Sequence, residues 1–268
     1  LLFSPARYRM VTDAYLRGLA RNADPSGVRS VASFFLSRID SAVDARLRRR
    51  SHPEVDPQLR GEAQALLGQS AVAAARLAYA RLRELLASER WQHLAEHGAQ
   101  PQRLLWASTG TKDPSLPDTH YIEPLIGPYT VTTMPEPTAD AFDDHGRVAA
   151  TLSATAPEAT AITQQLERVL GVSMASIADQ LVGEGVQKFN APYEQLLDGL
   201  EQRARALAAV DEAGALAGIA AKLRAQVLRM TTAAGSGHAT SSLSAADLVA
   251  GLLFHEMCWD PSRPWAGE

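Results

Sequence analysis

The chain has 268 residues, 46% of them hydrophobic, so it is long enough to bury one large core or two smaller ones. Its net charge of −4 and the lack of a long basic face exclude nucleic acid as an expected partner. A single cysteine, Cys258, excludes an internal disulfide, and no apolar run approaches the length of a membrane span, so we predict a cytoplasmic protein without a membrane partner.

The first half of the chain alternates predicted strands with predicted helices. A helix with Pro5 in its first turn should follow the first strand, a long helix should cover residues 58–88, and Pro135 should open another. The strands are expected over residues 1–4, 28–40, 104–109 and 121–126. This order predicts an α/β fold with a parallel sheet, either a doubly wound sheet or, since four strands are counted, half of a (β/α)8 TIM barrel.

The second half is predicted to be helical. Helical periodicity covers residues 160–170 and 174–205, and further helices are expected over residues 219–230 and 244–254. We therefore divide the chain into four parts, namely residues 1–148, 149–207, a linker of Ala and Gly over 208–218, and residues 219–268. The chain begins within a strand and stops after a Pro-rich loop, so we interpret both ends as internal to a longer protein.

The segment from residue 31 to residue 38 carries the best candidates for a binding site. Strand alternation places two serines, Ser33 and Ser37, together with Phe35 on one face, while the residues between them are all apolar. Arg38 comes last, at the carboxyl end of the strand, where barrel enzymes hold their active sites. Hydroxyls that bind sugar oxygens and a guanidinium that grips a phosphate would supply a sugar-phosphate site.

Several charged groups also have simpler interpretations. Arg38 is placed equally well for a surface ion pair with Asp40 or Asp44. The motif of residues 93–97, HLAEH, has the spacing of a zinc-binding helix, but no third ligand is indicated, so we expect it to lie on a solvated helical face. The arginines of residues 48–50 are expected in a solvated loop.

The SFFLSRID sequence of residues 33–40 resembles the sixth barrel strand of transaldolases. Other segments resemble the same family in the same order, namely LLFS at residues 1–4, LWASTGTKDP at 105–114, YIEPLIGP at 121–128 and TTMP at 132–135. The stretch of residues 179–197, which contains EGVQKF at 184–189, resembles it as well. The resemblance covers about residues 1–202. It implies that residues 1–148 are the C-terminal half of the barrel and that residues 149–207 are the family's closing helices.

The resemblance to transaldolases implies transfer of a dihydroxyacetone unit between sugar phosphates through a lysine Schiff base, without a cofactor. In that family the Schiff-base lysine lies on the fourth barrel strand, one unit before the strand with which this chain begins. We therefore expect no catalytic residue in this chain and no activity from it alone. Lysine suits the role because its amine can be made neutral near pH 7. Carried over by position, the expected substrate and phosphate contacts are Ser33, Phe35, Arg38, Ser108 and Lys112, whereas Lys188 and Lys222 should be solvated on helices.

A second resemblance covers residues 219–268. The LRM of residues 228–230, the GSGH of residues 235–238 and the SLSAAD of residues 242–247 are similar to the amino-terminal segment of transketolases. The resemblance implies that His238 reaches thiamine diphosphate, held with Mg²⁺, in the longer protein. That family usually continues with Pro-Gly after the histidine, where this chain has Ala239 and Thr240.

We therefore predict part of a transaldolase fused to the start of a transketolase, acting on sugar phosphates of the pentose phosphate route. The alternatives are a thiamine-dependent two-carbon transfer by the longer protein, a self-sufficient aldolase that uses Lys112, and a noncatalytic helical partner module over residues 160–205. The oligomeric state is left open, and a homo-oligomer is compatible with the sequence.

Overall fold

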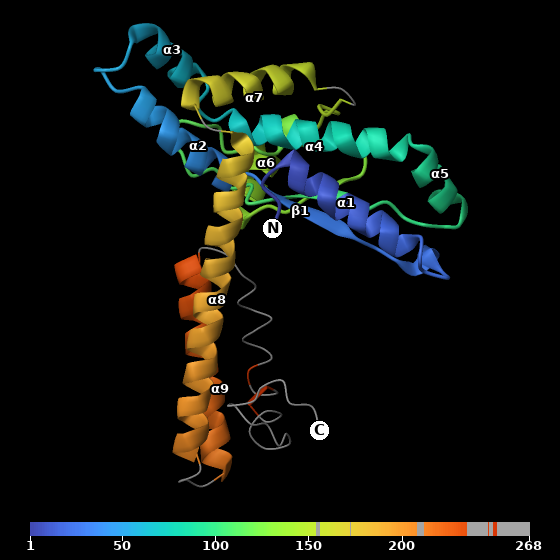
Figure 1. The fold of residues 1–268 in the computed structure, drawn as a ribbon. Helices are drawn as coiled ribbons and strands as arrows, with labels where there is room; N and C mark the ends of the chain where they lie inside the picture. The colour runs from blue at the N-terminus through green and yellow to red at the C-terminus, as the bar shows by residue number, and fades with distance from the viewer. Residues whose placement is uncertain (154–155, 172, 208–211, 235–245, 247–248, 251–268) are drawn as a thin grey trace. The chain divides into compact units, whose positions relative to one another are not determined.

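The computed structural model describes residues 1–153, 156–171, 173–207, 212–234, 246 and 249–250. The chain forms two compact units, Leu1–Gly185 and Val186–Glu268. No helix in the described ranges is both long and apolar enough to cross a lipid bilayer. The expected α/β fold is confirmed in the first unit (Figure 1).

The sheet of the first unit has three parallel strands in sequential order, β1 (Val31–Phe35), β2 (Arg103–Ala107) and β3 (Thr130–Thr132). Before β1, Leu2 forms a parallel bridge with Phe34, as the prediction of a strand end over residues 1–4 requires. Helix α1 (Pro5–Leu19) then begins where it was predicted, because Ser4 Oγ accepts a hydrogen bond from Arg7 N and Pro5 occupies the first turn.

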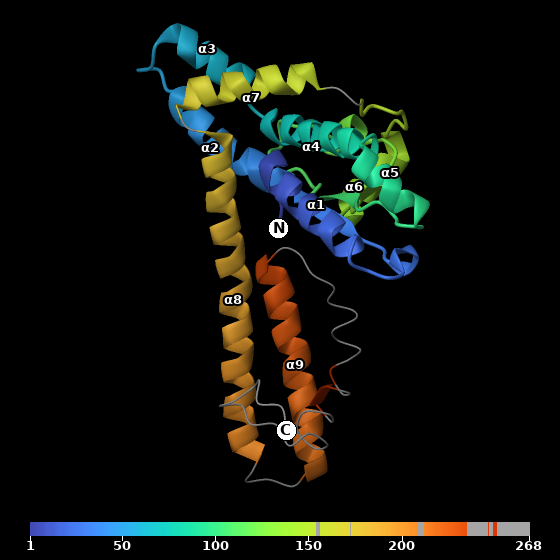
Figure 2. The same ribbon diagram turned by 45° about the vertical axis from the view of Figure 1, so that its right-hand side comes forward.

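The connection from β1 to β2 carries four helices, α2 (Ser37–Arg50), α3 (Pro57–Ala65), α4 (Ser70–Leu86) and α5 (Glu89–Glu96). Helix α2 continues beyond the carboxyl end of β1, and α4 returns along the sheet between α1 and α7 (Pro157–Leu170) (Figures 1 and 2). The arginines of residues 48–50 form the last turn of α2, so the expected loop is wrong.

The long helix predicted over residues 58–88 is wrong, because the chain turns between α3 and α4. Gly68 adopts a φ of +71°, and a Cβ atom there would lie 2.7 Å from Cδ2 of Leu116. Only glycine takes that conformation without strain and leaves room for the leucine. The good helix formers on both sides are therefore interrupted by a turn that distant residues hold in place.

The strand predicted over residues 121–126 is also wrong. A short 3₁₀ helix, η2 (Glu123–Leu125), lies there, and the edge strand is β3. Pro124 has no N–H for a ladder, and the consecutive residues Tyr121 and Ile122 are both buried instead of alternating between two faces. Helix α6 (Glu136–His145) follows Pro135 as predicted.

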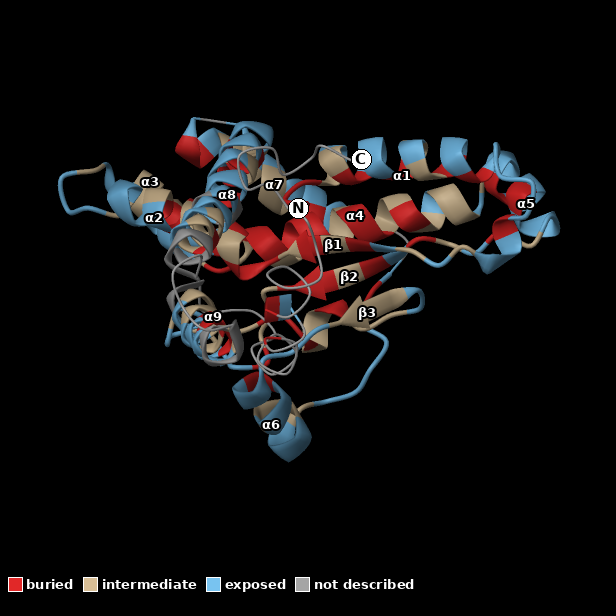
Figure 3. Cartoon of the chain, turned by 90° about the horizontal axis from the view of Figure 1, so that it is seen from below, coloured by how far each residue is buried: buried red, intermediate tan, exposed pale blue. Residues whose placement is uncertain are grey.

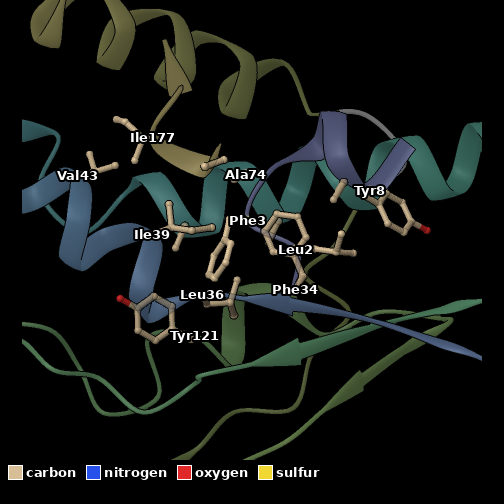
Figure 4. Close-up of a cluster of buried hydrophobic side chains, with 14 of the residues drawn as sticks. Leu2, Phe3, Tyr8, Phe34, Leu36, Ile39, Val43, Ala74, Tyr121 and Ile177 are labelled. Carbon is tan, nitrogen blue, oxygen red and sulfur yellow. The ribbon is translucent and has the colours of Figure 1, made fainter. Parts of the chain in front are cut away.

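The core of the first unit lies between the sheet and its helices (Figure 4). The strands turn one face to the helices, and that face holds Ala32, Phe34, Leu104 and Trp106, all buried. Trp106 is fully buried, donates from Nε1 to Leu125 O at 2.9 Å, and meets the ring of Phe34 edge to face with centroids 6.0 Å apart. Figure 3 shows this burial on β1 and β2 and its decline at β3.

The remaining described helices are α8 (Met174–Leu207) and α9 (Glu212–Ala234). The start of α8 joins the core of the first unit through Ile177, Ala178 and Leu181. In the second unit, Leu200 packs with Ile219 and Leu223. Helix α9 includes residues 212–218, which we expected in the linker, and the helix predicted over residues 244–254 lies almost wholly outside the described residues.

Candidate functional site

The carboxyl ends of β1 and β2 lie side by side and are tied to each other by the main chain. Leu36 N donates to Ala107 O at 2.9 Å, and Ser37 N donates to Ser108 O at 3.0 Å. Ser108 itself adopts a φ of 54°, which is uncommon for a residue other than glycine. The residue after each strand is therefore held at a fixed position along this edge of the sheet.

Arg38 lies at this edge, but in the first turn of α2 and not in the strand, which ends at Phe35. Its guanidinium carbon is 5.6 Å from the centroid of the Phe35 ring, a distance suited to a cation–π contact. Its Nη1 also lies 4.0 Å from the position that a Cβ on Gly185 would take. The expected alternation across residues 31–38 thus holds through Leu36 and is replaced by helix at Ser37.

Ser33 and Phe35 lie half-buried on the sheet face that points away from α4. Register places Ser33 beside Leu105, and the ring of Phe35 packs 5.7 Å from that of Phe3. Ser37, predicted on the same face, is instead buried, and its hydroxyl has no hydrogen-bond partner among the described residues. The structure therefore places Arg38 against Phe35, and Ser33 lies two residues before Phe35 on the same strand face.

Lys112 lies in a separate cavity of about 270 Å³, next to Arg48 and a group of three aspartates. Asp40, Asp44 and Arg48 are four residues apart on α2, so they share one face of the helix, and Arg38 lies on another. Arg48 forms an ion pair with Asp113 across the cavity. Hydrogen bonds from Ser115 to the Asp113 carboxylate lower its pKa.

The aspartates of this cavity organise the protein backbone. Asp40 Oδ1 accepts from Ser70 Oγ at 2.5 Å and from Ala71 N at 2.8 Å, so it caps the start of α4. Asp44 accepts from Gly68 N at 3.1 and 3.2 Å. Neither forms an ion pair with Arg38 in the described part of the chain, so the surface pairing that was an alternative for Arg38 is wrong.

Burial raises the pKa of Asp44 to about 6, and the negative charge of Asp40 adds to that effect while the hydrogen bond from Gly68 opposes it. Sequence reasoning treated both aspartates as surface groups and missed this cluster. A signal was present in the GQS sequence of residues 68–70, since a glycine followed closely by a serine is typical of one helix ending and the next beginning.

The other candidates lie apart from this edge. Lys188 and Lys222 are exposed on α8 and α9, as predicted. His93 and His97 lie on and just after α5 with their rings 4.7 Å apart, and no group of three or more potential ligands that could hold a metal occurs among the described residues. His238 lies outside the described residues.

Comparison with known proteins identifies relatives for the first three quarters of the chain. The family model described as transaldolase/fructose-6-phosphate aldolase matches residues 1–200. Transaldolases from Parafrankia sp. and Thermobifida fusca are 46% and 47% identical over 208 residues, which is 76% of this chain and 54% of each relative. A transaldolase from Mycobacterium marinum is 44% identical over 214 residues, 78% of this chain and 55% of the relative. The chain spans about half the length of these curated relatives.

Proposed function

Because this chain belongs to the transaldolase/fructose-6-phosphate aldolase family, we propose that it forms the phosphate-binding half of an enzyme that transfers a dihydroxyacetone unit between sugar phosphates. The observation that carries the proposal is the contact of Arg38 with Phe35 at the carboxyl end of β1, with Ser33 two residues earlier on the same face of the strand. A guanidinium at that edge can hold a phosphate dianion through two parallel charge-assisted hydrogen bonds.

The sheet supports a barrel over a doubly wound arrangement. The described strands are parallel and follow one another in sequential order, as consecutive strands of a (β/α)8 barrel do. Their helices α1 and α4 pack on one face, whereas the row of Ser33, Leu105 and Val131 on the other face is half-buried. We assign that second face to the inside of a barrel, because a doubly wound sheet would place helices on both faces.

The substrate phosphate lies against Arg38 in this proposal, and Ser33 and Ser108 bind oxygens of the sugar. The main-chain bond from Ser37 to Ser108 fixes the two strand ends relative to each other, so the arginine and the second serine are positioned before substrate arrives. Phe35 holds the guanidinium by its ring face and limits the directions in which Arg38 can point. Lys112 lines the neighbouring cavity, and its contact with the substrate remains a prediction.

The Schiff-base lysine of the proposed reaction is not one of the three lysines of this chain. Lys188 and Lys222 are exposed on helices, where nothing desolvates the amine. Lys112 lines a polar cavity with Arg48 and the carboxylates of Asp40, Asp44 and Asp113, whereas a Schiff-base lysine is commonly activated by an apolar surrounding. The chain alone should therefore bind sugar phosphate without forming a covalent adduct.

The resemblance of residues 219–268 to transketolases remains a separate prediction. The matching family model ends at residue 200, and the loop with His238 is outside the described residues. Thiamine diphosphate and Mg²⁺ would belong to that second activity alone, and no step of the proposed transfer passes through them. The pentose phosphate route, a cytoplasmic location and the oligomeric state also remain predictions.

Fructose 6-phosphate tests the proposal directly. We expect calorimetry to show binding that Arg38→Ala weakens by about tenfold or more and that Arg38→Lys restores only in part, because lysine cannot make the paired contact. Arg49→Ala, which removes an exposed arginine from the same helix, is the matched control. Equal binding by Arg38→Ala and the parent sequence contradicts the proposed phosphate site.

Borohydride trapping tests the position of the nucleophile. We expect no covalent adduct when the chain is incubated with fructose 6-phosphate and borohydride. An adduct that Lys112→Ala abolishes would contradict our assignment and establish the self-sufficient aldolase instead.

A further inference from the structure

A second cavity of the first unit, of about 460 Å³, lies at the opposite edge of the sheet, where the strands begin. Arg29 precedes β1, Arg103 opens β2, and Tyr129 directly precedes β3, and all three line it. Main-chain bonds hold these starts together, because Arg103 N donates to Ser30 O and Leu104 N donates to Tyr129 O, each at 3.1 Å. Five residues of β2 separate this cavity from the proposed phosphate site at the other edge.

The cavity is lined by two guanidiniums and by no carboxylate of the described residues. Arg29 uses Nη1 to bond Ser26 O at 2.6 Å and Val28 O at 3.2 Å, and its Nε and Nη2 bond no described residue. The guanidinium of Arg103 forms neither a hydrogen bond nor an ion pair within the described ranges. Two cations without an acidic neighbour favour an anion between them.

A hydroxyl adds a third donor. Ser30 Oγ accepts a hydrogen bond of 2.8 Å from Gln102 Nε2, so the Ser30 proton remains available to donate. Gln102 is itself buried, so its side chain holds the Ser30 oxygen in place. Two planar guanidiniums and one hydroxyl can satisfy the three terminal oxygens of a phosphate monoester.

Apart from Gln100, the rest of the wall is largely apolar, and it includes an unusual tyrosine. Tyr129 adopts a φ of 63°, which is rare for a bulky side chain, and the residue is 46% exposed. Val31 and Pro101 line the same cavity, and Val31 is 43% exposed. Strained residues of this kind cluster at ligand-binding sites, and an aromatic ring beside arginines suits a planar ligand. The cavity has the size of a small-molecule site and exceeds the needs of phosphate alone.

We infer that this amino-terminal edge is a binding site for a phosphate monoester that carries a planar ring, of the class of the nucleoside monophosphates. Arg29 and Arg103 hold the phosphate with Ser30, and Tyr129 stacks on the ring. The site is distinct from the proposed sugar-phosphate site, which lies at the other ends of the same strands.

Isothermal titration of the chain with AMP at low ionic strength tests the inference. We expect saturable binding that Arg103→Ala and Arg29→Ala each weaken by about tenfold or more, whereas Arg49→Ala leaves it unchanged. Tyr129→Asn, which tolerates the positive φ, should weaken AMP binding and leave inorganic phosphate binding unchanged. Circular dichroism melts establish that each variant is folded.

Three outcomes overturn the inference. They are no AMP binding at millimolar concentration, equal binding by the Arg103→Ala and parent sequences, and, in the Arg38→Ala variant, inorganic phosphate or ribose 5-phosphate binding as tightly as AMP. Loss of AMP binding in Arg38→Ala would place the nucleotide at the other edge and also contradicts it. Failure of the sugar-phosphate proposal is read separately, from fructose 6-phosphate binding in Arg38→Ala.

Discussion

The hydroxyl of Tyr121 donates a hydrogen bond of 2.8 Å to Oδ2 of Asp40, a residue 81 positions earlier in the chain. The other carboxylate oxygen of Asp40 caps α4, so one buried side chain joins α2, α4 and the segment before η2. Figure 4 shows Tyr121 within the core, beside the start of α2. Burial and the nearby carboxylate both raise the pKa of Tyr121, so its proton stays in this bond at all ordinary pH values.

Removing the carboxylate of Asp40 should be strongly destabilising. Asp40→Ala leaves the Tyr121 hydroxyl and the donors of Ser70 and Ala71 buried without an acceptor, so we expect the free energy of unfolding to fall by about 3 kcal/mol or more. Urea denaturation followed by circular dichroism measures the change. Asp143→Ala removes an exposed aspartate and should cost less than about 0.5 kcal/mol.

The two partners of this bond should be energetically coupled. Tyr121→Phe alone should cost about 1 kcal/mol, because only one bond is lost. In the double variant Asp40→Ala/Tyr121→Phe, the combined cost should be smaller than the sum of the single costs, since an unpaired hydroxyl is removed. Strict additivity would show that the bond contributes nothing in solution.

A side chain at Gly68 should destabilise the turn between α3 and α4. Gly68→Ala must adopt a φ of +71° and displace Leu116, so we expect a loss of about 2 kcal/mol. Gly61→Ala is the matched control, because Gly61 lies within α3 and no atom lies within 4 Å of the position that a Cβ would take there. Alanine at that position should stabilise the chain by about 0.5–1 kcal/mol. Thermal melts of the two variants should therefore shift in opposite directions.

Asp44 should make stability fall as pH rises through the acid range. Its folded pKa of about 6 lies above the ordinary value of 3.8, so the folded chain binds this proton more tightly, and stability decreases between about pH 4 and pH 6. Asp44→Asn keeps an acceptor for Gly68 N without the buried charge. Allowing for solvent screening, we expect the free energy of unfolding of the variant to rise by about 1 kcal/mol relative to that of the parent sequence between pH 4 and pH 7.

Denaturation at several pH values gives this difference between the two sequences. A difference that stays constant from pH 4 to pH 7 would contradict the raised pKa. A difference that grows in favour of the aspartate would mean that Asp44 gains more from nearby cations such as Arg48 than it loses through burial.

Trp106 should contribute more to stability than Trp91. Trp106→Phe leaves Leu125 O without its indole donor and opens a gap beside Phe34, so we expect a loss of about 2–3 kcal/mol. Trp91→Phe, at the edge of a smaller cluster with Leu16 and Leu94, should cost about 1 kcal/mol. Equal losses in urea denaturation would show that the indole bond is unimportant.

Features that depend on residues close together in the sequence could be predicted from the sequence. The alternation of Ala32, Ser33, Phe34 and Phe35 identified the buried face of β1, and Pro5 marked the start of α1. The resemblance to transaldolases rested on several short motifs in the right order, and the family match over residues 1–200 confirms it. The roles of Ser33, Phe35, Arg38, Ser108 and Lys112 stay predictions.

The sequence by itself therefore determined the α/β class, the family, and the strand β1 that precedes Arg38. The tertiary structure alone decided where the long helix breaks, that residues 123–125 form a 3₁₀ helix, and that Asp40 and Asp44 are buried. The reason is physical, because each of these features depends on partners far along the chain, such as Leu116 for Gly68 and Tyr121 for Asp40. Local propensity carries no information about such partners until the chain has folded.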